Sequence, residues 1–403
     1  MFSIKYVPFV PTIHATCSGL GDLGIVPLDV LQMILLKAGG RTVRILSSGL
    51  KHLFDEVNTT LSIVRPSQEA YPPNIGKLVS NLVGNCKALS SIKMEAYYIS
   101  AVMHCAPCLA ALRDLRTLVL SNNYMGSEGA STFAPCLMAL TGLRKLQLTG
   151  NDIGPAGAAS LAPAIGMLTG IQTLDLSGNT LGPSSGASLA PALVMLTGLR
   201  TLNLRNNDLG PAGAAVLAPA LMTLPDLHTL DLSYNNIGQD GAASLTPSLR
   251  ALSGLRTLVL SINNIGSAGA TSLVSTLTVL TGLSALDLSL NRLGPAGVAS
   301  LAPSLMELTG LRELDLSYNS LGPTGAASLA PSLMALTRLR DLSLGQNSFG
   351  PVGAAALTPS LVTLSGLNTL NLSFNYMGPA GVSSLRSSLS VLTGLHELSL
   401  SGN

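Results

Sequence analysis

The chain repeats itself every 28 residues, and this period limits its possible folds more than any other feature. From Leu115 to Asn403 each unit opens with the segment LxxLxLxxN, without insertion or deletion. We number the places of a unit from its first residue. The units begin at Leu115, Leu143, Ile171, Leu199, Leu227, Leu255, Leu283, Leu311, Leu339, Leu367 and Leu395. Such a pattern predicts stacked copies of one small unit.

The first half of each unit predicts a short β-strand. Leu at the fourth and sixth places, such as Leu230 and Leu232, has the period of two that buries one face of a strand. The ninth place is Asn in all eleven units, from Asn123 to Asn403. An amide side chain there can hydrogen-bond the backbone where the chain turns inward, so we expect a ladder of asparagines with a structural role.

The second half of each unit predicts a helix. Gly-Pro, as in Gly294-Pro295, places Pro in the first helical turn, where its missing N–H removes no hydrogen bond. In the unit that begins at Leu311, a buried stripe is expected from Ala326, Leu329, Leu333 and Leu336. A second Pro falls about eight residues into the helix and predicts a kink or a break. This Pro is found at Pro163, Pro191, Pro219, Pro303 and Pro331.

The expected fold class is α/β, a curved solenoid or horseshoe with a parallel β-sheet on its concave face and helices on its convex face. We expect a tail at residues 1–22, a small helical segment at 23–60, and degenerate repeats or a cap at 61–114. A strand is expected at Leu61–Val64 and a worn one at Leu89–Met94. Ten complete repeats and a truncated eleventh then fill 115–403, so the chain could also be a fragment without its C-terminal cap.

Composition and short motifs argue against several classes of function. The 22 basic and 20 acidic residues are spread along the chain, without a basic patch for nucleic acid or a membrane. Cys105 and Cys108 form a CxxC without a second ligand pair, and Cys108 and Cys136 occupy the same place in successive units, which favours small-residue packing. We therefore expect no enzyme activity, no cofactor and no metal. The five cysteines suggest no disulfide framework, and we expect a cytoplasmic protein, with the nucleus as the alternative.

The pattern LxxLxLxxNxLGPxGAxxLAPxLxxLTG resembles the ribonuclease-inhibitor-like subfamily of leucine-rich repeats over about Leu115 to Asn403. This subfamily includes ribonuclease inhibitor, Ran GTPase-activating proteins and innate-immune receptors. The resemblance implies protein recognition as the function, and it does not choose among these relatives.

The segment from Leu23 to Asp55 resembles an F-box in Pro27, Asp29 and Ile34, and departs from it at Val26 and at Leu53-Phe54. The resemblance implies binding to the adaptor of a cullin-RING ubiquitin ligase. The alternative is a helical cap over the first repeat. The implied adaptor-binding residues are Pro27, Leu28, Val30, Leu31 and Ile34.

The concave face is the expected binding surface, because places three, five and seven of each strand point away from the buried leucines. The fifth place carries Asp175, Asp231, Asp287 and Asp315, and the eighth, at the rim, carries Tyr234, Ile262, Leu290, Tyr318 and Phe374. The alternative is that these Asp residues only favour hydration and that the eighth-place residues pack on adjacent loops. The arginines at the second place are expected to pair with neighbouring carboxylates at the edge.

The sequence therefore predicts a non-catalytic protein-binding protein, most specifically the substrate-recognition subunit of a ubiquitin ligase. The alternatives are a general leucine-rich-repeat scaffold or a sensor of the immune type without an F-box, and a regulator like the Ran GTPase-activating proteins.

Overall fold

The computed structural model describes residues 12–16, 26–27, 59–64, 89–95 and 106–403. The chain divides into two compact units, residues 1–179 and residues 180–403, and each is described by itself. We call them the first and the second unit of the fold, and we call each 28-residue unit a repeat.

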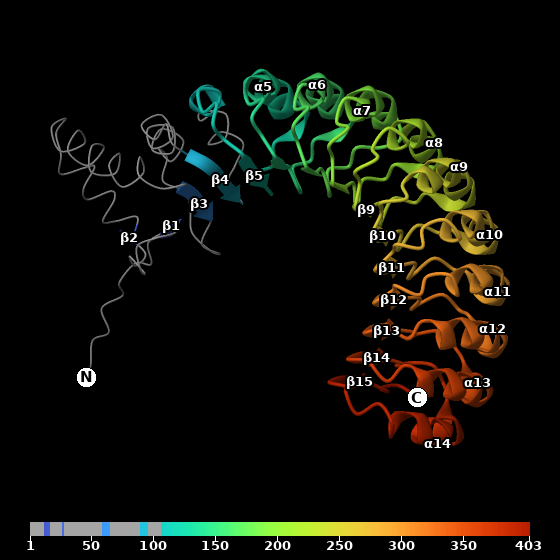
Figure 1. The fold of residues 1–403 in the computed structure, drawn as a ribbon. Helices are drawn as coiled ribbons and strands as arrows, with labels where there is room; N and C mark the ends of the chain where they lie inside the picture. Colours follow the sequence, from blue (N-terminus) through green and yellow to red (C-terminus); the bar gives the residue numbers. More distant parts are fainter. Residues whose placement is uncertain (1–11, 17–25, 28–58, 65–88, 96–105) are drawn as a thin grey trace, which may run out of the picture. The chain divides into compact units, whose positions relative to one another are not determined.

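The first unit of the fold contains a sheet with helices on one side of it (Figure 1). Strands β3 to β7 pair in parallel in sequence order, whereas β1 pairs antiparallel with both β3 and β2. The elements are β1 (Thr12–Thr16), β2 (Val26–Pro27), β3 (Thr59–Val64), β4 (Leu89–Glu95), β5 (Thr117–Ser121), α5 (Gly126–Ala139), β6 (Lys145–Gln147), α6 (Gly154–Gly166) and β7 (Thr173–Asp175).

The second unit of the fold alternates helices with strands that all pair in parallel, from β8 to β15. In Figure 1 its strands follow the inner side of a curve and its helices the outer side. The elements are α7 (Ser185–Val194), β8 (Thr201–Asn203), α8 (Gly210–Leu221), β9 (Thr229–Asp231), α9 (Gly238–Ala251), β10 (Thr257–Val259), α10 (Gly266–Leu277), β11 (Ala285–Asp287), α11 (Gly294–Leu305), β12 (Glu313–Asp315), α12 (Gly322–Ala335), β13 (Asp341–Ser343), α13 (Gly350–Thr363), β14 (Thr369–Asn371), α14 (Gly378–Leu389) and β15 (Glu397–Ser399).

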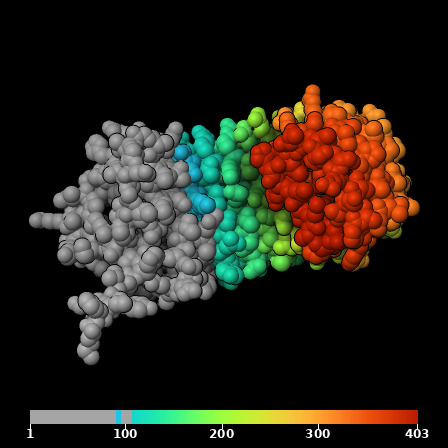
Figure 2. Space-filling model, turned by 90° about the horizontal axis from the view of Figure 1, so that it is seen from below, coloured from blue at the N-terminus to red at the C-terminus, as the bar shows by residue number. Residues whose placement is uncertain are grey.

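The hydrophobic core is built from equivalent leucines of successive repeats. Leu230, Leu258 and Leu286 pair in register and are 0–2% exposed, as the period of two predicted. The predicted helical stripe from Ala326 to Leu336 is also fully buried. Within each unit of the fold, successive repeats pack on one another. In the second unit the colours pass from green to red with the sequence in the space-filling view (Figure 2). Burial of these leucines is the main stabilising contribution to the stack.

The predicted asparagine ladder is present. Asn291 donates from Nδ2 to the carbonyl oxygens of Leu288 (3.1 Å) and of Leu260 in the preceding repeat (2.8 Å). Its Oδ1 accepts the backbone N–H of Asn263 at 3.0 Å. Asn291 is fully buried, so these bonds satisfy both ends of a buried amide. Each such asparagine therefore joins its own turn to the preceding repeat.

The predicted breaks at the second proline do not occur. Pro163 and Pro303, for example, lie inside the continuous helices α6 and α11. A proline leaves the carbonyl four residues earlier without its helical partner, and that residue, Ala159 or Ala299, is exposed. Water can then satisfy the carbonyl. The helix therefore continues through the proline on its outer side.

The N-terminal part differs from the sequence prediction in its strands. The expected strands at Leu61–Val64 and Leu89–Met94 are observed as β3 and β4. Thr12–Thr16, within the expected tail, form β1. The prediction of a first helical turn at Pro27 was wrong, because Val26–Pro27 form β2. Thr and Ile favour extended backbone, and Pro is tolerated in β2 because that strand is at the edge of the sheet. Of the expected helical segment at 23–60, residues 23–25 and 28–58 lie outside the described residues, and Thr59 and Thr60 belong to β3.

Candidate functional site

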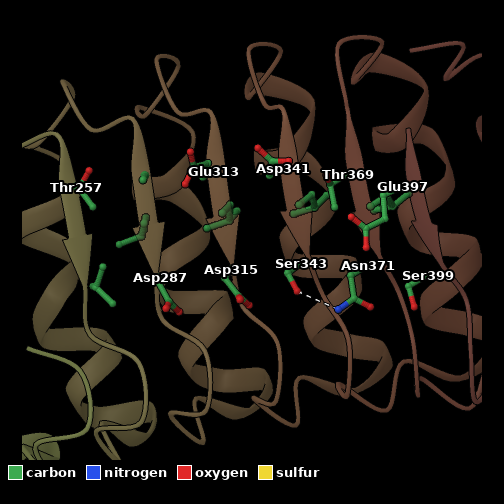
Figure 3. A pocket seen from close by; sticks show the side chains of 16 residues that line it. Thr257, Asp287, Glu313, Asp315, Asp341, Ser343, Thr369, Asn371, Glu397 and Ser399 are labelled. Atoms are coloured by element: carbon green, nitrogen blue, oxygen red, sulfur yellow. Dashed lines mark hydrogen bonds between the residues drawn. The ribbon is translucent and has the colours of Figure 1, made fainter. Parts of the chain in front are cut away.

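The inner face of the sheet in the second unit of the fold is hollowed. The hollow has a volume of about 560 Å³ and extends across β10 to β15. Figure 3 shows its polar side chains in two rows, one from the third place of each strand and one from the fifth. These rows are Thr257, Glu313, Asp341, Thr369 and Glu397, and Asp287, Asp315, Ser343, Asn371 and Ser399. We call this surface the acidic hollow.

The fifth-place aspartates are held by the serine two residues later. Oδ1 of Asp287 accepts the backbone N–H of Ser289 at 2.9 Å and its hydroxyl at 2.7 Å. Ser317 gives Asp315 the same two bonds, at 2.8 and 2.6 Å. One oxygen of each carboxylate is thereby fixed by its own strand end. Asp287 and Asp315 line the hollow, and these bonds set the orientation of their carboxylates.

Asp315 lies in a crowded carboxylate environment. Burial raises its pKa above the ordinary value, and the bonds from Ser317 oppose that shift. The negative charge of Asp287 on the neighbouring strand raises the pKa of Asp315 further. A cationic group placed between these two carboxylates would reduce the repulsion between them.

Three further carboxylates were missed by the sequence analysis. Glu313, Asp341 and Glu397 occupy the third place of β12, β13 and β15 and line the acidic hollow. Within the described part of the chain, none of their three carboxylates has a hydrogen-bond or ion-pair partner. These three residues could have been found from the alternation of side chains along a strand, because the third place faces the same side of the sheet as the fifth.

Negative charge dominates this face of the second unit of the fold. At the third, fifth and seventh places from Thr201 to Ser401 there are six carboxylates and a single basic residue, Arg205. The guanidinium of Arg205 lies 4.9 Å from the centre of the Tyr234 ring, so its charge is placed over an aromatic face. The near-neutral chain therefore carries a locally acidic surface.

A row of large side chains follows the hollow at the eighth place of each repeat. Tyr234, Leu290, Tyr318 and Phe374 are 41–50% exposed, and Ile262 is half-buried. We call these five residues the rim stripe. With the tenth-place residues, including Tyr376, four of them line a groove of about 690 Å³ that extends along the repeats from Tyr234 to Tyr376. Tyr376 was also missed by the sequence analysis.

The rim stripe adopts a backbone conformation that its residue types disfavour. All five residues have φ between 53° and 58°, the left-handed region. Gly and Asn adopt this region most readily, and a β-branched residue such as Ile262 does so at a cost of about 1–2 kcal/mol. In the four earliest repeats the eighth place is accordingly Asn122, Gly150, Gly178 and Asn206. From Tyr234 to Phe374 large residues replace them, except at Gln346.

Hydrogen bonds to the next repeat impose this conformation. The N–H of Ile262 donates to the carbonyl oxygen of Ser289 at 3.0 Å, and that of Tyr234 donates to Ser261 at 2.9 Å. The following asparagine is fixed in the same way by the ladder. The fold therefore requires the left-handed turn whatever side chain occupies it.

The structure locates all nine residues that the sequence placed on the concave face. Asp231, Asp287 and Asp315 and the rim stripe belong to the second unit of the fold. Asp175 belongs to the first, where it is buried and accepts bonds from Ser177 and from Gln147. That these residues bind a partner stays a prediction. Of the implied adaptor-binding residues, Pro27 lies in β2, whereas Leu28, Val30, Leu31 and Ile34 lie outside the described residues.

The arginines at the second place do not pair with carboxylates as the sequence predicted. Nη1 of four of them donates to the backbone carbonyl oxygen of the glycine 26 residues later, at 2.6–2.8 Å. Each of these arginine side chains is long enough to reach the turn that comes before the strand of the next repeat. These pairs are Arg116 with Gly142, Arg144 with Gly170, Arg256 with Gly282, and Arg340 with Gly366.

Cys108 and Cys136 form no disulfide bond within the described residues, and Cys136 is buried. Burial raises the pKa of Cys136 to about 12, so its thiol is neutral at physiological pH. Within the described residues there is no group of three or more His, Cys, Asp or Glu side chains that could hold a metal ion. Among the same residues, no helix has the length and apolar character needed to cross a bilayer.

The family model described as Leucine Rich repeat matches nine segments of the sequence. They are residues 111–134, 140–162, 170–190, 197–218, 223–245, 254–274, 281–302, 308–330 and 367–385. The matched segments contain the strands and helices described above, and the chain is a leucine-rich-repeat protein. No curated protein sequence matches it.

Two solved structures resemble the chain in fold. One is an internalin from Listeria monocytogenes, at 20% sequence identity and a TM-score of 0.53, covering 89% of this chain and 88% of the internalin. The other is TLR13 in a complex with ssRNA13, at 21% identity and a TM-score of 0.42, covering 81% of this chain and 45% of TLR13. The internalin supports the leucine-rich-repeat fold.

Proposed function

We propose that this protein is a non-catalytic binding protein that holds a protein partner on the inner face of residues 180–403. The observation that carries the proposal is the rim stripe. Large apolar side chains occupy left-handed positions where Asn or Gly would be more stable, and they remain about half exposed to solvent. Features kept at a cost in stability commonly serve binding.

The chemistry of the surface favours a protein over a nucleic acid. Exposed Tyr and Phe side chains are frequent anchors of protein interfaces. The six carboxylates of the inner face would repel a phosphate backbone, which is bound elsewhere mainly through Lys and Arg. A protein segment can combine cationic and apolar groups and so suits both parts of the surface.

Affinity capture with matched variants tests the proposal. The full chain is used as bait beside Tyr234→Asn/Tyr318→Asn, which introduces a residue already found at this place in earlier repeats. Met334→Asn/Val352→Asn, at exposed positions of α12 and α13, serves as the control. We expect the captured proteins to be lost from the rim variant and kept by the control. Equal capture by all three forms would contradict the proposal.

The finer hypothesis of a ubiquitin-ligase receptor rests on the sequence resemblance at residues 23–60. It predicts that the ligase adaptor binds the full chain and that Pro27→Ala/Ile34→Asp abolishes the binding. If neither form binds the adaptor, the general scaffold alternative is favoured for this chain.

A further inference from the structure

We infer that the partner presents an extended segment in which basic residues alternate with apolar residues, and that this segment lies across β10 to β15. The inference rests on the proposed function and adds the chemistry of the partner. It combines the charge of the acidic hollow with the neighbouring groove along the rim stripe.

The acidic hollow is complementary only to positively charged groups. The hollow is lined by Asp287, Glu313, Asp315, Asp341 and Glu397, and no Lys or Arg lines it. The charges of Glu313, Asp341 and Glu397 are not balanced by any partner among the described residues. Lys and Arg side chains are the protein groups that neutralise carboxylates in such a setting.

The dimensions of the surface suit an extended chain. Neighbouring strands are about 4.8 Å apart, so six strands cover roughly 24 Å, which an extended segment of about seven residues would match. The rim stripe, at the eighth place, lies three residues after the fifth place, where each strand ends. A segment that runs across the strands therefore has carboxylates on one side and the rim groove on the other.

The alternation follows from that placement. Successive side chains of an extended segment point in opposite directions. One set would reach toward the carboxylates of the third and fifth places, and the other toward Ile262, Leu290 and Tyr318 in the rim groove. The first set must be basic and the second apolar.

The probe is a fluorescein-labelled peptide of about seven residues in which Lys and Val alternate. Its binding to the full chain is measured by fluorescence anisotropy beside that of a Glu/Val peptide and an oligouridine RNA. We expect the Lys/Val peptide to bind at least about tenfold more tightly than either of the others and to weaken as salt is raised.

Matched charge reversals locate the site. Glu313→Lys/Asp341→Lys reverses two charges in the hollow, and Lys is compatible with the third place because Lys145 occupies it in β6. Glu307→Lys/Asp226→Lys makes the same change at exposed positions outside the hollow. We expect about tenfold weaker Lys/Val binding for the first variant and less than about twofold for the second. Circular dichroism melting confirms that each variant is folded.

Several results would overturn the inference. They are equal binding of the Lys/Val and Glu/Val peptides, tightest binding of the RNA, and equal losses in the two reversal variants. If the Lys/Val peptide fails while capture still depends on Tyr234 and Tyr318, this inference is wrong and the proposed function stands. If the peptide binds as expected while the Tyr234→Asn/Tyr318→Asn variant captures the same proteins as the unchanged chain, the proposed function is wrong.

Discussion

The eighth place of each repeat brings backbone geometry and side-chain choice into conflict. Hydrogen bonds to the next repeat hold Ile262 at a φ of 56°, where its branched Cβ is crowded against its own backbone. Asn206, at the same place in an earlier repeat, has a φ of 55° with far less strain. At the scale of the residue, the rim stripe lowers the stability of the fold and provides exposed apolar surface.

Substitution at Ile262 tests this conflict directly. We expect Ile262→Asn to raise the free energy of unfolding by about 1 kcal/mol, because the left-handed conformation is relieved. The reverse change, Asn206→Ile, should lower it by a similar amount. Both are measured by urea denaturation followed by circular dichroism. A loss of stability in Ile262→Asn would show that its side-chain contacts outweigh the strain.

At the scale of the element, the turn after each strand is fastened to its neighbours by one buried amide. Asn291 joins the carbonyl oxygens of two repeats and accepts an N–H from a third position, Asn263. Arg256 adds an exposed link to Gly282 on the other end of the strand. The buried links carry more energy, since water cannot replace them.

Removal of one ladder amide should therefore be costly. We expect Asn291→Ala to lower the free energy of unfolding by about 3 kcal/mol, because it leaves buried backbone groups without partners. Asn368→Ala, at an exposed second place, is the control and should change stability by less than about 0.5 kcal/mol. Hydrogen exchange should show the loss of protection centred on residues 260–294. A near-neutral Asn291→Ala would contradict the structural role of the ladder.

The elements were predictable where periodicity alone decides them. Leu230 and Leu232 fixed the strand and its buried side, and Gly294-Pro295 fixed the start of a helix. The sequence did not exclude a break at Pro303, because the effect of this proline depends on whether the freed carbonyl faces water, which requires the three-dimensional structure. The pairing of β1 with β3 depends on contacts distant in sequence, and no local pattern reports them.

The candidate surface was predictable only in part, for a related reason. Asp287 and Tyr318 stood out as repeated residue types, whereas Glu313 and Asp341 differ from the Thr usual at their place and so did not form a sequence column. The register of adjacent strands gathers them into one hollow. The left-handed backbone of the rim stripe also has no sequence signature when the residues are Tyr, Ile, Leu and Phe.

At the scale of the molecule, repetition separates stability from recognition. The buried Leu and Asn positions keep the same residue type in nearly every repeat, while the inner face varies from repeat to repeat. The variation within residues 180–403 concentrates carboxylates in the hollow and large apolar groups beside it. A binding surface can thus change by substitution without disturbing the stack, as is typical of solenoids.

Site-specific photo-cross-linking tests the central claim, that partners bind the inner face, most directly. Benzoylphenylalanine is introduced in place of Tyr318, at the rim, or of Val352, which is 71% exposed on α13. After irradiation with the captured partner, adducts are identified by mass spectrometry. We expect a covalent adduct from position 318 and none from position 352. An adduct from position 352 alone would contradict binding at the inner face.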